Sequence, residues 1–92
     1  MPTFSAEEIA QHLTTIPDWH LENGVLVRCF SFTDFREAMS FVNSVASVAE
    51  HAGHHPDIDI RYNKVNLALS SHDAGGITDR DFSLAGEIGR IL

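Results

Sequence analysis

The sequence has little basic charge, a single cysteine and no long apolar run. Lys and Arg number 6 against 13 Asp and Glu in 92 residues, which gives a net charge of −7. Phosphate binding needs clustered basic side chains, so this charge argues against a nucleic-acid partner and against an anionic membrane surface. No apolar stretch approaches the roughly 18 residues of a membrane span. The N-terminus also lacks the basic and then apolar segments of a secretory signal.

The one cysteine, Cys29, cannot form an internal disulfide. It lies in the apolar stretch VLVRCF, which favours a small hydrophobic side chain over a nucleophile and fits a reducing compartment. We therefore expect a cytoplasmic protein. A length of 92 residues is typical of one domain, so residues 1–92 are predicted to form a single domain whose modest core oligomerisation would supplement.

Capping and turn residues predict three helices and two hairpins in alternation. A capping-box spacing precedes the first and last helical patterns, and an Asn-Gly pair typical of a type I′ turn separates two strand-like runs. The predicted caps and turns are Ser5 with Glu8, Asn23-Gly24, Thr33 or Asp34, Gly53, Asn63-Lys64, and Thr78 with Asp81.

The longest predicted helix carries a wide apolar stripe. Its members recur at three- and four-residue steps: Phe35, Met39, Val42, Val45, Ala46 and Ala49. Phe41 and Val48 lie off this stripe and widen it. The extra apolar face could contact another subunit or pack under a loop, and the sequence leaves both alternatives open.

Polar and apolar residues alternate on both arms of the second hairpin. One face of the hairpin is predicted to be buried, and it consists of Ile58, Ile60, Tyr62, Val65, Leu67 and Leu69. With a turn at Asn63-Lys64, the register would place His55 opposite His72. Two hairpins separated by a helix predict an α+β fold, a four-stranded antiparallel sheet with three helices packed on one face.

Four of the six histidines lie close together, beside Glu50: His51, His54, His55 and His72. Zinc needs three or four ligands, but two adjacent histidines point opposite ways in an extended chain, so no metal site is predicted. Histidine titrates near neutral pH, and imidazoles with different neighbours can act as acid and base, with Glu50 orienting one of them. We favour this acid/base interpretation over chance, and interpret His12, His20 and His51 as incidental.

The order of these residues is distinctive. Glu50 is followed after three residues by His54-His55-Pro56, and then by Tyr62, His72 and Asp81. This order and spacing resemble those of the pterin-4a-carbinolamine dehydratases, also called 4a-hydroxytetrahydrobiopterin dehydratases. The resemblance extends over almost the whole chain, through FSFTDFREAMSFV and YNKVNLALSSHDAGGITDRD.

The resemblance implies loss of water from a 4a-hydroxytetrahydropterin to give quinonoid dihydropterin, without metal or organic cofactor. This lyase reaction recycles the pterin cofactor of aromatic amino-acid hydroxylation. The implied catalytic residues are His54, His55 and His72, supported by Glu50, with His55 and His72 flanking the 4a-hydroxyl and His54 acting at the ring. Family members assemble through sheet edges and helix packing, so a homodimer or homotetramer is expected.

The resemblance also implies where the pterin binds. The expected substrate-binding residues are Gly53, His54, His55, Ser70, Ser71, His72, Asp73 and Trp19. Animal members often have an acidic residue where Gly53 stands, so only a backbone contact would remain there. Trp19 is expected either to stack on the pterin or to be a structural aromatic. Asp81 is expected to cap the last helix or to orient a site residue, and Tyr62 to lie in the core.

A second function of another class stays open. Some animal members of the family act as dimerisation cofactors for a homeodomain transcription factor through the long helix. The present chain could therefore be a protein-interaction module that retains the pocket, although its intact histidine set favours catalysis.

Overall fold

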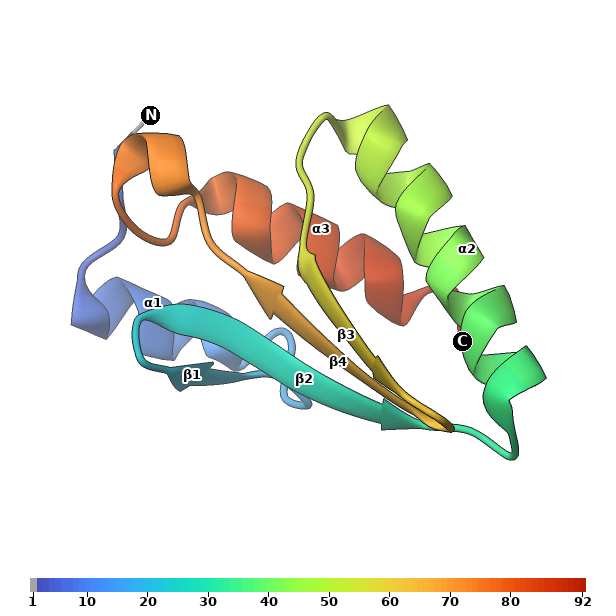
Figure 1. Cartoon of the computed structure of the whole chain (residues 1–92). Coiled ribbons are helices and arrows are strands. Elements are labelled where there is room, and N and C mark those ends of the chain that lie inside the picture. The colour runs from blue at the N-terminus through green and yellow to red at the C-terminus, as the bar shows by residue number, and fades with distance from the viewer. Residues whose placement is uncertain (1) are drawn as a thin grey trace.

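The computed structural model describes residues 2–92, and its helices and strands alternate as predicted. The helices are α1 (Ala6–Leu13), α2 (Phe35–Ala52) and α3 (Asp79–Gly89), and a short 3₁₀ turn, η1 (His72–Ala74), precedes α3. The strands are β1 (His20–Glu22), β2 (Val25–Ser31), β3 (Asp57–Arg61) and β4 (Lys64–Leu69). They form one antiparallel sheet in the order β1-β2-β4-β3, with the helices on one face (Figure 1). The predicted α+β fold is confirmed.

The helix caps and the first turn form where the sequence predicts them. The α1 and α3 helices begin with complete capping boxes, and the Asp34 side chain caps α2. Gly53 ends α2 with φ of 66°, a left-handed conformation that glycine adopts without strain. Asn23 and Gly24 both have positive φ, as a type I′ turn requires.

The core lies between the sheet and the helices. It includes Leu26 and Phe30 of β2, and Val65, Leu67 and Leu69 of β4. The α2 helix adds Ala38, Phe41, Val42, Val45 and Ala49.

The buried face of α2 differs from the predicted stripe. Phe41 and Val48 form no outward apolar face, because Phe41 packs against Phe30 in the core, with 4.6 Å between the centroids of the tilted rings, and the partly buried Val48 packs against that core. Phe35, by contrast, is 49% exposed, and Ala46 is also exposed. The buried stripe starts at Ala38 and not at Phe35, so the arc that faces the sheet is rotated relative to the predicted one.

The turn between β3 and β4 also differs from the prediction. Arg61 pairs with Lys64, so the turn residues are Tyr62 and Asn63, and the register is shifted by two residues. Tyr62 takes φ of 53° in this turn and is 64% exposed, so its predicted place in the core is wrong. The Asn63 side chain instead donates a hydrogen bond to the Phe32 carbonyl, at 2.9 Å. Continued past the strand ends, this register places Ser70, and not His72, opposite His55.

The other face of the sheet is uncovered, and β1 and β3 are its edge strands. Ile58 is on the helix side of β3 but is exposed because the strand is at the edge. Cys29, expected to serve as a small hydrophobic side chain, is exposed on the uncovered face. Within residues 2–92, no helix is long and apolar enough to cross a membrane.

Candidate active site

The predicted site residues other than Trp19 come from four neighbouring segments at one end of the sheet. These are the end of α2, the loop into β3, the end of β4, and η1 with the first turn of α3 (Figure 1). The antiparallel pairing of β3 and β4 brings the residues before β3 and those after β4 to this same end.

His54 is turned toward the helices. Its Nε2 is 2.6 Å from Oδ1 of Asp81, and its side chain is only 10% exposed. A carboxylate only accepts hydrogen bonds, so the Nε2–H of His54 donates to Asp81. This fixes the ring orientation and leaves Nδ1 as the ring atom available for proton transfer.

Asp81 is fully buried and is the centre of a polar network. Its Oδ2 accepts hydrogen bonds from the Ser71 hydroxyl, at 2.8 Å, and from the Thr78 backbone N–H, at 2.9 Å. The hydroxyls of Ser71 and Thr78 are also 2.8 Å apart. Asp81 therefore makes both contacts that the sequence suggested, since it caps α3 and holds His54.

His55 is directed outward, opposite to its neighbour. Its Nε2 contacts a carboxylate oxygen of Glu50, and the two side chains are 61% and 78% exposed. Glu50 therefore pairs with His55. It does not pair with His54, although His54 follows Glu50 by four residues, about one helical turn. The two consecutive histidines each have a carboxylate partner, one exposed and one buried.

His72 opens η1 and is exposed, with its Nε2 3.4 Å from the Ser70 hydroxyl. The next residue, Asp73, accepts a hydrogen bond from the Arg80 guanidinium at 2.7 Å. This contact with Arg80 holds the pKa of Asp73 below its usual value. Loop η1 is thus attached to the start of α3 on the exposed side as well as through Ser71.

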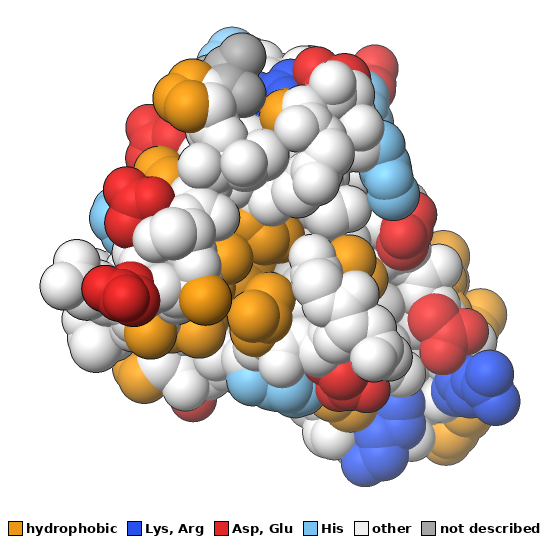
Figure 2. Space-filling model, turned by 90° about the vertical axis from the view of Figure 1, so that its left-hand side faces the viewer, with side chains coloured by type: hydrophobic (Ala, Val, Ile, Leu, Met, Phe, Trp, Pro, Cys, Tyr) orange, Lys and Arg blue, Asp and Glu red, His pale blue; other side chains and the backbone are white. Residues whose placement is uncertain are grey.

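His54 and His72 line two different hollows of the described residues. His54 lines a cleft of about 200 Å³ between α2 and α3, together with Ala52, Arg80 and Ser83. His72 and Ser70 line a separate hollow of about 270 Å³ beside the β1–β2 turn. Seen from the left-hand side of Figure 1, histidine side chains appear at several separate places on the surface (Figure 2). Within residues 2–92, no three His, Cys, Asp or Glu side chains are arranged to share a metal ion.

Two of the predicted substrate-binding residues, Ser71 and Trp19, are buried. Ser71 is fully buried, with its hydroxyl directed to Asp81. Trp19 is 4% exposed, packs edge-on against Phe30, and lines a different cleft with Arg28 and Ala85. Its contacts fit the structural alternative for this residue.

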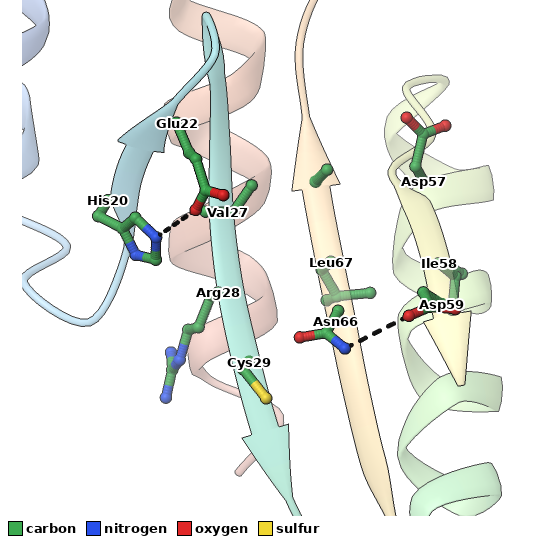
Figure 3. A pocket seen from close by; sticks show the side chains of 11 residues that line it. His20, Glu22, Val27, Arg28, Cys29, Asp57, Ile58, Asp59, Asn66 and Leu67 are labelled. Carbon is green, nitrogen blue, oxygen red and sulfur yellow. Dashed lines mark hydrogen bonds and ion pairs between the residues drawn. The ribbon is translucent and has the colours of Figure 1, made fainter. Parts of the chain in front are cut away.

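A further hollow, of about 340 Å³, lies on the uncovered face of the sheet (Figure 3). Val27 of β2 and Asn66 of β4 lie in its middle, and His20 and Asp57 lie on opposite sides. None of the predicted site residues lines it. His20 contacts Glu22 there at 3.0 Å, and His12 stacks on Phe4 and packs against Phe82, so both have local structural partners.

Sequence reasoning missed the roles of Thr78 and Arg80 around the site. Thr78 was identified only as a helix cap, but its hydroxyl also reaches Ser71. Arg80 holds Asp73 and lines the cleft of His54, and its Nε is buried without a hydrogen-bond partner among the described residues. The run TDRD carries both residues, but only its capping-box spacing gave a signal.

The chain is similar to known proteins over almost its whole length. The family model for pterin 4 alpha carbinolamine dehydratase matches residues 2–91. A protein of Chloroflexus aurantiacus, described as a pterin-4-alpha-carbinolamine dehydratase, is 56% identical over 92 residues, which are 100% of this chain and 99% of the relative. A protein of Acidobacterium capsulatum with the same description is 52% identical, with all of both chains covered. The crystal structure of a transcriptional coactivator/pterin dehydratase from Brucella melitensis has a TM-score of 0.92 at 28% identity, with 97% of each chain covered.

Proposed function

This chain belongs to the pterin-4a-carbinolamine dehydratase family, whose activity is that of a hydro-lyase, and on that premise we propose that it dehydrates 4a-hydroxytetrahydropterin by histidine acid/base catalysis. The observation that most supports this mechanism is that consecutive histidines each have a carboxylate partner, His54 with Asp81 and His55 with Glu50. Such pairs orient an imidazole and stabilise its protonated form.

The proposed reaction needs one proton donor and one proton acceptor. The C4a–O bond of the substrate breaks, and the leaving hydroxyl takes a proton from an imidazolium and departs as water. N5 gives its proton to a neutral imidazole, and the electron pair of the N5–H bond becomes the C4a=N5 double bond of quinonoid dihydropterin. Histidine supplies both forms near neutral pH, and each positioned proton transfer contributes on the order of 10²–10⁴-fold.

We assign His55 and His72 to the 4a-hydroxyl and His54 to the ring. His72 is beside Ser70, and the register of the hairpin continues from Ser70 to His55, which supports placing this pair on one side of the pterin. Glu50 would stabilise the protonated form of His55. Gly53, Ser70 and Asp73 are proposed as further contacts, whereas the burial of Ser71 and Trp19 favours a supporting role for their side chains over contact with the substrate.

Two further proposals follow from the family. The physiological task would be to recycle the pterin cofactor of aromatic amino-acid hydroxylation. The protein would also form a homodimer or homotetramer, and the unpaired side of edge strand β3 supports pairing of sheet edges. The interaction-module alternative loses one of its supports, because Phe41 lies in the core of its own chain and the partly buried Val48 packs against that core.

The test is the dehydration rate of freshly generated 4a-hydroxytetrahydropterin, with and without chelator. The wild type should accelerate the reaction whether or not chelator is present, and His55→Ala should lose at least about 10²-fold. His20→Ala is a matched control, because His20 is also an exposed histidine paired with a glutamate, and it should keep full activity. No acceleration over buffer would refute the enzyme proposal, and loss of activity with chelator would refute the metal-free mechanism.

A further inference from the structure

We propose that Ser71 is a positioning residue that fixes His54 and His72 relative to each other through Asp81. This inference rests on the proposed function, because it assumes that both histidines act on one substrate. Ser71 contacts neither histidine through its side chain. It acts through a buried group of three side chains, Ser71, Thr78 and Asp81, which we call the Asp81 clamp.

Every polar group of Ser71, in its backbone and in its side chain, makes a hydrogen bond. Its backbone N–H donates to the Gly76 carbonyl at 2.9 Å, and its own carbonyl accepts from the N–H groups of Ala74 and Gly75, each at 3.0 Å. Its hydroxyl, with none of the residue exposed, donates to Asp81. Because the backbone bonds close the loop on itself, the hydroxyl is the contact that fixes the whole loop to α3 from the buried side.

His72 follows Ser71 directly, so the hydroxyl contact is one residue from the imidazole that it would place. On the other side of His72, Asp73 is attached to Arg80 at 2.7 Å, but this contact is exposed. Exposed ion pairs contribute little, whereas hydrogen bonds to a buried carboxylate are strong. The buried contact of Ser71 therefore determines where His72 is held.

Asp81 connects this contact to His54. Its Oδ1 accepts from His54, and its Oδ2 accepts from Ser71 and from the Thr78 N–H. A carboxylate is planar, so Asp81 cannot turn away from one set of donors without moving relative to the other. A helix cap alone would need only the bond to the Thr78 N–H, and the two added bonds are the ones that link His54 to the loop of His72.

Ser71→Ala tests the inference, because it removes one donor and leaves the backbone bonds in place. Misplacement of a catalytic group by about 1 Å can cost on the order of 100-fold, so kcat should fall by about 10- to 100-fold with KM little changed. Val65→Ala is the control for lost stability alone. It opens a core cavity at the far end of β4 and should keep kcat.

Two measurements on the same protein do not depend on dehydratase activity. In the wild type, the His54 Nε2–H should give a downfield proton resonance in slow exchange with water, and Ser71→Ala should shift or broaden it. Hydrogen exchange of the Gly75 and Thr78 amides should accelerate by about 10-fold or more, since a bond to a charged buried group is lost. The β4 amides should not change. Val65→Ala should leave the His54 resonance in place.

The outcomes separate the two proposals. If the wild type shows no dehydratase activity, the proposed function fails, while the resonance and the exchange rates still report on the clamp. If Ser71→Ala keeps kcat within about 3-fold and leaves the resonance and exchange unchanged, the inference is wrong. Should Ser71→Ala not fold, Ser71→Cys keeps the volume with a weaker donor and should show the same changes to a smaller degree.

Discussion

Replacing Asp81 by Ala and by Asn should have different consequences, because three donors converge on this one buried carboxylate. Asp81→Ala leaves the His54 Nε2–H and the Thr78 N–H without an acceptor, whereas the Ser71 hydroxyl can still donate to the Thr78 hydroxyl. An unsatisfied buried donor costs about 1–3 kcal/mol, so the two together amount to roughly 2–6 kcal/mol. A domain of this size has about 5–15 kcal/mol of stability. We expect Asp81→Ala to be marginally folded or unfolded at 25 °C.

Asp81→Asn should fold, because the amide oxygen can still accept from Ser71 and Thr78. The amide nitrogen would then face His54 and donate to its Nε2, which moves the imidazole proton to Nδ1. In a histidine–carboxylate pair, the wrong tautomer is known to be costly for proton transfer. We expect a loss of stability below about 3 kcal/mol and a loss of kcat on the order of 10²-fold or more.

Urea unfolding and the dehydration rate are the measurements for both variants. Asp59→Asn is the matched control, since Asp59 is an exposed carboxylate with side-chain partners, and its free energy of unfolding should change by less than about 1 kcal/mol. The reasoning would be refuted if Asp81→Ala lost as little stability as this control. It would also be refuted if Asp81→Asn kept wild-type kcat.

Three smaller predictions concern the caps and the exposed side of the site. Bonds from Ser5 hold the pKa of Glu8 below 4.5, so its contribution to stability is complete above the pKa of the unfolded chain and is lost as pH falls through the folded value. The difference in Tm between wild type and Glu8→Gln should therefore be present at pH 7 and shrink on acidification below pH 4.5. Gly53→Ala should cost about 1 kcal/mol in thermal unfolding through its positive φ and not through a clash, because the space around it is open. Gly53→Asn should cost less, and equal costs would contradict a conformational origin. Arg80→Gln should raise the pKa of Asp73 toward its usual value in a carboxyl NMR titration, and an unchanged titration would exclude the ion pair in solution.

The parts of the fold set by neighbouring residues were predictable. The capping boxes at Ser5 and Thr78, the Asn23-Gly24 turn and the stop at Gly53 each depend on residues within one helical turn. The opposite directions of His54 and His55 also followed from the extended backbone. These features need no knowledge of the tertiary structure.

The features that failed depend on distant contacts. Asn63 was expected to open the turn because asparagine tolerates positive φ, but its side chain bonds to Phe32, 31 residues away, and Tyr62 takes the left-handed conformation instead. An orienting role was expected for Asp81, but the sequence did not indicate His54 as its partner, because the two residues are 27 positions apart. Likewise, nothing near Ser71 in the sequence indicates that it is buried and Ser70 is not.

The unequal exposure of the two histidine–carboxylate pairs makes them respond differently to dissolved ions. The Glu50–His55 pair is open to solvent, so counterions at physiological ionic strength, with a screening length of about 8 Å, weaken its attraction. The Asp81–His54 pair is closed off from those ions by the protein around it. The histidines of the two pairs are consecutive residues, yet they would respond differently to salt. Added salt would weaken the attraction in the outer pair, Glu50–His55, and leave that in the inner pair, Asp81–His54, unchanged.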